Sequence, residues 1–345
     1  MTPADTELAA GRKAIAVLYN ALMTGLVLTL VSRRGEQAAA DFVFAHFRRQ
    51  HLEKFLPGLE KLGLAGLPDA VACASYHFHS NALGGVKTQL LIESDRKAWV
   101  RYPPPRWIWQ GAAVCAVPPR VNEAMLHGWH GHNGVSLGNP RLGFVCTGQT
   151  VLGHPGLEGY YVEYDQEVAE DQRVRFACDE ACPPIDPAAQ PVLDLAAWPP
   201  ERLARVEVSY AAEYVRSLLP VMHALFGPAQ AEALVGQTAR LIGLQFHEAT
   251  AAALGIHDEG ADSFAGLLAA LARAQGETVE VDGPRVVQTG WRLMRGVPLD
   301  PALAFAAWNP LLEGLLAAHN RHLRLSSELS GDRLVWTVGP NENGG

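Results

Sequence analysis

The sequence predicts an α+β fold made of two similar copies, each a helical segment packed on a small antiparallel sheet. Three observations predict it: long apolar segments with helical spacing recur, short alternating segments are joined by turn sequences, and several landmarks repeat at near-constant spacing. The 345 residues are enough for two domains with proper cores. We divide the chain into a first copy at 1–165, which carries the candidate site, a Pro- and Asp-rich linker at 166–200, and a structural second copy at 201–340.

Composition narrows the class of protein. Hydrophobic residues make up 48% of the chain, which is ordinary for a folded globular protein. The formal charge is −8 and the Lys and Arg pairs are isolated, so we expect no nucleic-acid partner. Five cysteines in an irregular pattern argue against a secreted disulfide framework. These features favour a cytoplasmic protein with free thiols, and the abundance of Ala, Pro, Gly and Arg suggests a bacterial source.

The helices are predicted from apolar periodicity and from Gly and Pro at their ends. They are expected at 13–32, 36–62, 68–84 and 119–133 in the first copy, and at 201–226, 228–254, 261–275 and 300–318 in the second. The segment 14–31 is nearly all apolar and long enough to span a bilayer or to serve as a signal-peptide core. Its counterpart at 206–225 carries Glu207, Glu213 and Arg216. We therefore favour a buried core helix or a homodimer interface over a membrane segment.

The strands are predicted from alternation and from turn sequences. They are expected at 86–93, 97–102, 141–147 and 158–165, and at 277–282, 285–294, 321–329 and 332–338. Tyr160, Val162 and Tyr164 alternate with Tyr161 and Glu163, as in a half-buried strand. The turn sequences at 93–96, 282–284 and 330–332 join neighbouring strands and indicate antiparallel hairpins.

Landmarks that recur in order support a duplication. Gly35 and Gly227 are 192 residues apart, Asp69 and Asp262 are 193 apart, and Trp99 and Trp291 are 192 apart. Near the end of each copy the spacing falls to 183, because the loop 103–118 of the first copy is longer than its counterpart at 295–299. Chance similarity between two Ala- and Leu-rich halves is the alternative.

Histidines are concentrated in two short segments of the first copy, 76–81 and 127–133. The matching positions of the second copy hold apolar or acidic residues or Pro, so only the first of the two copies carries histidines there. This asymmetry indicates one working pocket, in the first copy. Each helical residue advances by about 100°, so His77 and His79 point apart and only His77 is expected to face a common pocket.

A second set of side chains suggests a metal site. On a helix over 119–133, Glu123, His127 and His130 share one face at i, i+4 and i+7. Two imidazoles and a carboxylate fit zinc or the two-histidine, one-carboxylate arrangement of non-haem iron. His132 follows Gly131 and could turn back toward the same space. The candidate metal ligands are therefore Glu123, His127, His130 and His132, and the cofactor they would bind is a divalent metal, zinc or iron.

The remaining candidates describe a small-molecule pocket. His77 and His130 are candidate general bases, and Cys115 or Cys146 could act as a nucleophile, although buried inert thiols are the commoner case. The tryptophans of the loop 103–118 could cover the pocket or cap the sheet. The candidate catalytic residues are His77, His130 and Cys115, and the candidate substrate-binding residues are Tyr76, Asn81, Trp107, Trp109, Trp129 and Asn133.

Two short motifs and the order of elements resemble the family of bacterial L-2-amino-thiazoline-4-carboxylic acid hydrolase-like proteins. The motifs are Asn-Pro-Arg-Leu at 139–142 and Ser-Gly-Asp-Arg at 330–333. The likeness covers most of the chain, once per half, and Cys115 and Cys146 are the residues that could stand at the family's cysteine positions. The resemblance implies a hydrolase that opens a C–N bond of a small cyclic amidine.

Three classes of function follow from these observations. The first is a small-molecule hydrolase acting on a C–N bond, with or without a metal, with its site in the first half. The alternative is a non-enzymatic module that binds haem or another small ligand through the same histidines and tryptophans. The third is an interaction protein in which the segment 14–31 forms the dimer surface.

Overall fold

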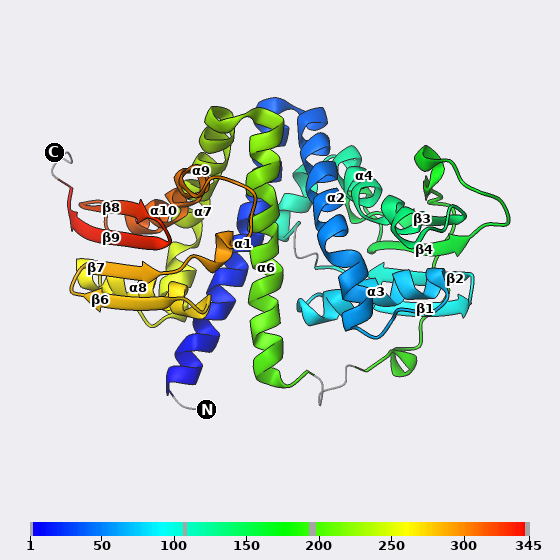
Figure 1. Cartoon of the computed structure of the whole chain (residues 1–345), viewed down its shortest axis with the longest axis horizontal. Coiled ribbons are helices and arrows are strands. Elements are labelled where there is room, and N and C mark those ends of the chain that lie inside the picture. Colours follow the sequence, from blue (N-terminus) through cyan, green and yellow to red (C-terminus); the bar gives the residue numbers. More distant parts are fainter. Residues whose placement is uncertain (1–2, 106–108, 193–197, 342–345) are drawn as a thin grey trace. The chain divides into compact units, whose positions relative to one another are not determined.

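The computed structural model describes residues 3–105, 109–192 and 198–341. Contacts divide the chain into two compact units, which are Leu30–Leu203 and a second unit formed by Met1–Thr29 with Ala204–Gly345. Each unit combines helices with a sheet (Figure 1), so the predicted α+β class is confirmed. The predicted boundaries at 1–165, 166–200 and 201–340 describe repeated copies rather than these contact units, and they stay a prediction.

The unit Leu30–Leu203 contains the first sheet and the predicted site. Its elements are α2 (Glu36–Lys61), α3 (Asp69–Leu83), β1 (Gln89–Ser94), β2 (Lys97–Tyr102), η1 (Gly111–Ala116), α4 (Pro119–Gly128), η2 (His130–His132), α5 (Asn133–Leu137), β3 (Leu142–Gly148), η3 (Thr150–Leu152), β4 (Leu157–Glu163), η4 (Glu170–Gln172), β5 (Val174–Phe176) and η5 (Pro187–Ala189).

The second unit repeats much of this order. It takes the N-terminal part of α1 (Pro3–Arg34) and nearly all of α6 (Pro200–Phe226). Its further elements are α7 (Pro228–Ala253), α8 (Ala261–Ala274), β6 (Thr278–Asp282), β7 (Arg285–Thr289), η6 (Arg292–Met294), α9 (Pro301–Trp308), α10 (Pro310–His319), β8 (Leu323–Ser330) and β9 (Arg333–Pro340).

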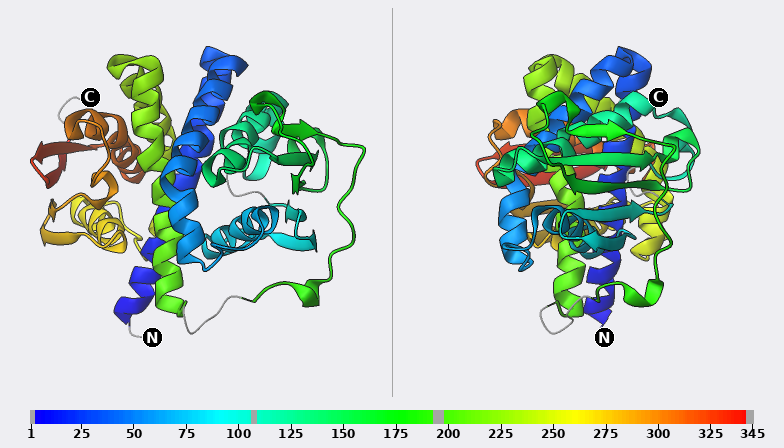
Figure 2. Two further views of the ribbon diagram at one scale, coloured as in Figure 1. Left: turned by 45° about the vertical axis from the view of Figure 1, so that its right-hand side comes forward. Right: turned by 90° about the vertical axis from the view of Figure 1, so that its right-hand side faces the viewer.

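The two sheets share one strand order. The first sheet runs β1-β2-β4-β3-β5 and the second runs β6-β7-β9-β8, so the four strands common to both occupy the same places. The right-hand view of Figure 2 looks onto the first sheet. The three predicted hairpins are confirmed, with Ser94 opposite Lys97, Asp282 opposite Arg285 and Ser330 opposite Arg333. Matching order favours the duplication, which itself stays a prediction.

The linker contributes a strand that sequence patterns did not predict. β5 pairs with β3 in parallel, with Phe144 opposite Val174. With only three residues, it offers too little alternation to be recognised in sequence. A second linker residue, Gln190, uses its side-chain amide to bond both the N–H and the C=O of Leu90 on the edge strand β1, at 2.8 and 2.9 Å. The linker is thus tied to both edges of the first sheet.

Strand alternation gives the first sheet two different faces. Trp99, Val145 and Tyr160 form an apolar cluster on one face, with Ala177 and Cys182 of the linker packed against it. The residues that precede and follow these three along each strand point to the opposite face, toward α3, which packs on β2 and β4. His77 and His130 lie against this second face, beside Tyr161.

Four predicted elements differ clearly in extent from the observed ones. The helix expected at 13–32 begins ten residues earlier, at Pro3. The helix expected at 119–133 ends at Gly128, where a Cβ would lie 2.7 Å from the carbonyl oxygen of Phe44 on α2. The helix expected at 300–318 is broken at Asn309, because Pro310 cannot donate the hydrogen bond that would continue it. The strand expected at 285–294 stops at Thr289, before Gly290 with φ +86°.

Within the described residues, one helix is long and apolar enough to cross a membrane by length and composition. It covers Asp5–Arg34, and 61% of its 18-residue apolar window is buried.

Candidate functional site

A stacked pair of histidines lies in the interior of the unit Leu30–Leu203. The rings of His77 and His130 are nearly parallel, with 9° between their planes and 4.2 Å between their centroids. Tyr161 lies beside both rings, at centroid distances of 5.9 and 5.6 Å. We call His77, His130, Asn133 and Tyr161 the histidine cluster; all four side chains are buried.

Four separate elements contribute these side chains, and Asn133 comes from α5. His77 comes from α3, His130 from the turn η2, and Tyr161 from β4. Alternation on β4 sends Tyr161 to the helical face of the sheet, opposite Phe144 in register, while Tyr160 joins the other face. His79 lies on another side of α3, partly exposed and against Phe78.

The Tyr161 hydroxyl holds the cluster together. It lies 2.6 Å from Nδ1 of His130 and accepts a hydrogen bond from Nδ2 of Asn133 at 3.1 Å. The hydroxyl and Nδ1 of His130 form one hydrogen bond, and the tautomer of His130 determines which of the two atoms donates. This chain ties η2 and α5 to the sheet.

Burial disfavours the charged forms of two members of the cluster, His77 and Tyr161. It lowers the pKa of His77 to about 3 and raises the pKa of Tyr161 well above its ordinary value. Burial also raises the pKa of the neighbouring Cys73 thiol, despite a hydrogen bond from Asn133 that acts in the opposite direction. At neutral pH these groups are therefore neutral, and the cluster has the character of a polar core.

Removing the Tyr161 hydroxyl tests this structural role. We expect Tyr161→Phe to lower the free energy of unfolding by about 1–3 kcal/mol, because buried nitrogens of His130 and Asn133 lose their partner. Urea denaturation measures the change. Tyr164→Phe is the matched control, since the Tyr164 hydroxyl makes no hydrogen bond within the described residues. Equal stability of the two variants would contradict the role assigned to the hydroxyl.

A cleft opens beside the cluster, on the other side of η2. Its volume is about 590 Å³, within the range of small-molecule sites. Gly131 lies in its wall between His130 and His132. We call it the α2–α4 cleft, and it is lined by Gln37, Ala40, Asp41, Phe44, Arg48, Arg120, Glu123, Ala124, His127, Gly131, Glu170 and Asp171.

An acid–base pair faces this cleft. Glu123 and His127 lie one turn apart on α4, at i and i+4. Partial burial lowers the pKa of His127, Glu123 acts to raise it, and Arg48 acts to lower it. The imidazole is therefore neutral at neutral pH and able to accept a proton. Glu123 also accepts a hydrogen bond from Gln149 at 3.4 Å, which steadies its carboxylate.

Arg48 connects α2 to the end of α4. Its guanidinium donates to the carbonyl oxygens of Gly128 and His127, at 2.9 and 3.1 Å. These carbonyls end a helix and have no helical donor, so a cation is well placed there. Burial lowers the pKa of Arg48, with Glu170 acting in the opposite direction. Arg48 thus fixes the position of His127 at the cleft.

The predicted metal ligands are divided between the two places. Glu123 and His127 line the cleft, whereas His130 turns into the cluster because α4 ends at Gly128 and the chain continues as η2. His132 packs against His51 instead, with 5.3 Å between centroids. Among the described residues, no group of three or more His, Cys, Asp or Glu side chains is arranged to hold a metal ion. The joint site predicted from helical spacing is therefore not supported.

Several other predicted residues have structural surroundings. Trp109 is buried and its indole N–H donates to Asn122 at 3.3 Å, so it fills the core rather than covering a pocket. Asn81 donates to the carbonyl oxygen of His77 within α3. Cys115 is exposed on η1 and is not among the cleft residues, while Cys146 is buried on β3. Trp107 lies outside the described residues.

Two predicted substrate-binding residues lie against the cluster. Tyr76 and Trp129 are stacked, with 6.1 Å between centroids, and both rings contact His77. His51 of α2 meets Trp129 edge-on at 5.5 Å. Like Asn133, these rings belong to the packed interior and do not line the α2–α4 cleft.

Sequence reasoning missed the residues that helix α2 contributes. Arg48 and His51 lie three residues apart on α2, and neither belongs to a histidine-rich segment. Arg120, at the start of α4, was missed as well. The spacing of Arg120, Glu123 and His127 at i, i+3 and i+7 is the signal that could have found the charged face of α4.

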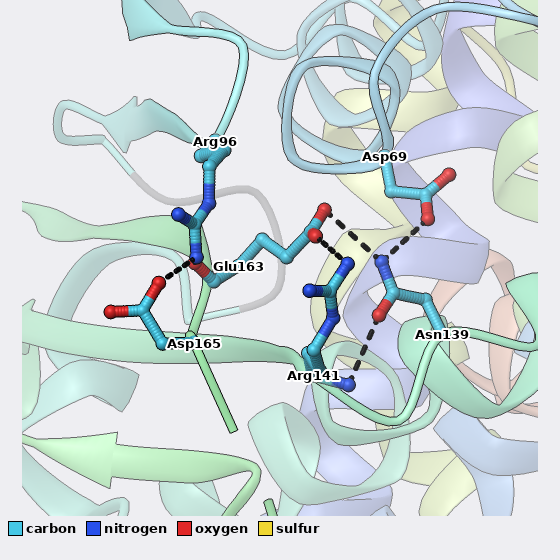
Figure 3. Close-up of polar contacts among 6 residues, drawn as sticks. All are labelled: Asp69, Arg96, Asn139, Arg141, Glu163 and Asp165. Carbon is cyan, nitrogen blue, oxygen red and sulfur yellow. Dashed lines mark hydrogen bonds and ion pairs between the residues drawn. The ribbon is translucent and has the colours of Figure 1, made fainter. Parts of the chain in front are cut away.

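The Asn-Pro-Arg-Leu motif forms a polar corner at the start of β3 (Figure 3). Asn139 donates to Asp69 at 2.7 Å and to Glu163 at 3.3 Å, and Arg141 is paired with Glu163. Arg96 and Asp165 form a neighbouring ion pair at 2.8 Å. The side chain of Asn139 also accepts from the N–H of Arg141, as Asn320 accepts from the N–H of His322 in the second unit. The motif thus has a local structural role in joining α3 to the sheet.

Comparison of the chain with models of protein families, with curated proteins and with solved structures found no match. The resemblance implied by the two motifs therefore stays a prediction.

Proposed function

We propose that the protein is a hydrolase that acts on a C–N bond of a small molecule in the α2–α4 cleft. One observation carries the proposal. The cleft has the volume of a small-molecule site and is lined by a neutral imidazole, His127, with a carboxylate one turn away and two arginines nearby.

The charges of the cleft suit a zwitterionic substrate. Arg120 is exposed at the cleft and can take a carboxylate, since guanidinium binds that group through paired hydrogen bonds. Asp41, Glu170 and Asp171 supply negative charge for a cationic amidine or amine. A small cyclic amidine that carries a carboxylate has both charges, and this is the substrate class that we propose.

The proposed reaction uses His127 as general base. Its imidazole takes a proton from water as the water oxygen attacks the amidine carbon, and a tetrahedral intermediate forms. The same imidazolium then returns the proton to the departing nitrogen, so that the C–N bond breaks. Glu123 favours the charged imidazole while it exists. In this scheme His77 and His130 hold η2, and with it Gly131, at the wall of the cleft.

Replacing His127 tests the proposed base. We expect His127→Ala to hydrolyse a carboxylated cyclic amidine at least about 100-fold more slowly than the unchanged protein, because general-base catalysis contributes on the order of 10²–10⁴. Ring opening is followed by proton NMR over a panel of such amidines. His322→Ala, an exposed histidine of the other unit, is the control and should keep full activity.

Two outcomes would contradict this function. One is an unchanged rate in His127→Ala. The other is saturable binding of the amidine without ring opening, which would favour the non-enzymatic small-ligand module instead.

Location and assembly are part of the same proposal. All five cysteines lie in the described part of the chain and are free thiols, which supports a cytoplasmic protein. A homodimer and a bacterial source are proposed from the sequence alone.

A further inference from the structure

The sheet of the second unit has an open edge at β8 (Figure 1). β8 holds the place in this sheet that β3 holds in the first sheet. There β5 pairs with β3 in parallel, and all seven residues of β3 are buried. Among the described residues no strand pairs with the corresponding edge of β8, and five of its eight residues are exposed. An edge of unpaired N–H and C=O groups is a template for another strand.

The backbone of β8 offers hydrogen-bonding groups to that edge at alternate residues. The β8–β9 hairpin closes with Ser330 opposite Arg333 across a two-residue turn, so this pair is hydrogen-bonded and the pairs alternate from it. The N–H and C=O groups of Leu325, Ser327 and Leu329 therefore point away from β9, toward the open edge. A further strand can pair with β8 at these three residues.

The side chains on the outer face of β8 carry opposite charges at a symmetric spacing. Arg324 and Glu328 are both exposed, with the exposed Ser326 midway between them. Four residues of strand separate their Cα atoms by about 13 Å, so they are not neighbours on their own strand. If a second copy of β8 pairs antiparallel and the pairing is centred on Ser326, each Arg324 lies directly opposite the other chain's Glu328. Opposite charges in this position stabilise a strand pair.

The same register also suits the backbone and the inner face. It places Leu325 opposite the second copy's Ser327, and Leu323 opposite the second copy's Leu329. These odd-numbered residues are those whose backbone groups point to the open edge, so they form the hydrogen-bonded pairs of the new ladder. Leu323 and Leu329 are each partly exposed in the single chain and would cover one another. Centring on Leu325 or Ser327 instead keeps the ladder but separates the charges.

We propose that β8 is a homodimer interface, at which it pairs antiparallel with β8 of a second copy of this chain, centred on Ser326. The pairing joins two four-stranded sheets into one. A two-fold axis then passes through Ser326, as in the isologous interfaces of most dimers. This surface is distinct from the segment 14–31. It lies in a different unit from the α2–α4 cleft, so it does not depend on the proposed amidine hydrolase.

Exchange of charges tests the interface by sedimentation velocity on the full-length chain. From about 1 μM to about 1 mM, the unchanged protein should pass from monomer to dimer. Arg324→Glu places like charges opposite each other twice, and should raise the dissociation constant about 10-fold or more. Glu328→Arg should do the same, and the two changes together should restore the original affinity. Arg285→Glu, at an exposed position of β7, is the control with the same change in net charge and should leave the affinity unchanged.

A cysteine at the centre of the pairing tests its register. In Ser326→Cys the two thiols face each other at a pair with about 4.5 Å between Cα atoms, which a disulfide can span. Oxidised glutathione should then link the chains, as two protein thiols form one S–S bond and two molecules of reduced glutathione are released. Peptide mass spectrometry should find residue 326 joined to residue 326. Ser330→Cys, at the end of β8, is the control and should not form the corresponding link.

Three results would overturn the proposal, once far-UV circular dichroism has shown that the variants are folded. The first is an unchanged protein that stays monomeric over the whole concentration range. The second is a dimer that Arg324→Glu does not weaken, which would favour another surface such as the segment 14–31. The third is a double charge exchange that fails to restore the dimer. None of these measurements uses the amidine reaction, so the two proposals fail separately.

Discussion

Gly314→Ala is expected to lower the free energy of unfolding by about 2–3 kcal/mol, the upper part of the range for overpacked cores. A Cβ at this position of α10 would lie 2.1 Å from the carbonyl oxygen of Arg240 on α7. Gly243 of α7 approaches α10 equally closely, with 2.1 Å from its added Cβ to the carbonyl oxygen of Leu311. The helices meet backbone to backbone, so the new methyl group must push them apart. Urea denaturation measures the loss.

Gly266→Ala is the matched control for this effect. Gly266 lies within α8, and an added Cβ meets nothing within 4 Å. Alanine should therefore stabilise the protein by about 0.5–1 kcal/mol, because it restricts the unfolded chain. Combining Gly243→Ala with Gly314→Ala should cost less than the sum of the two, since both act on one helix contact. Unchanged stability in Gly314→Ala would contradict the close packing of α7 on α10.

Acid is expected to destabilise the unit Leu30–Leu203 strongly. Burial lowers the pKa of His46, His51 and His77 from 6.5 to about 3 in the folded protein. Folding therefore excludes protons that the unfolded chain binds below pH 6.5, and stability present above that pH falls as the pH drops toward 3. At pH 5 each of these histidines lowers the free energy of unfolding by about 2 kcal/mol, because one pH unit below 6.5 corresponds to about 1.4 kcal/mol. For the three residues the total is about 6 kcal/mol, which approaches the whole stability of many domains.

Urea denaturation at pH 7.5 and pH 5 measures this dependence. His77→Gln removes one buried titrating group, so the difference between the two pH values should shrink by about 2 kcal/mol. Val145→Ala is the control: it removes buried apolar atoms and should lower stability by the same amount at both pH values. A protein equally stable at pH 5 and 7.5 would contradict the buried, neutral state of these histidines.

The two units place different polar side chains on one order of strands. In the unit Leu30–Leu203, side chains of α2 and α4 form the α2–α4 cleft, and the histidine cluster fills the adjoining core. In the second unit, the ends of α8 and α10 bring Ser263 to His319. Both units therefore contain hydrogen-bonded histidines. In the second unit His319 contacts His247 and the carbonyl oxygen of Gly260.

Local signals in the sequence predicted most of the fold. The strand predicted at 97–102 matches β2. Two of the predicted hairpin turns contain a glycine with positive φ, Gly283 and Gly331. Alternation around Tyr160 assigned successive tyrosines to opposite faces of β4, and the structure bears this out. These features depend on neighbours within a few residues, which is the range over which sequence patterns carry information.

The candidate site depended on contacts that helical spacing cannot predict. The expected face of Glu123, His127 and His130 required a continuous helix. In the structure α4 ends at Gly128, where the backbone packs closely against Phe44 of α2. Arg48 then reaches the freed carbonyl oxygens from a segment 80 residues away. The spacing was sound for a helix, but tertiary packing decided where the helix stopped.

The sequence by itself determined the α+β class, the order of the elements and the faces of the strands, because period, turn residues and apolar runs are properties of short segments. Only the tertiary structure decided that His77 and His130 are buried and stacked while His127 and Glu123 face a cleft. The physical reason is that burial and charge state depend on which distant segments meet. The imidazole of His130 is a polar group of the core against Tyr161, whereas the imidazole of His127 lies near Glu123 at the cleft.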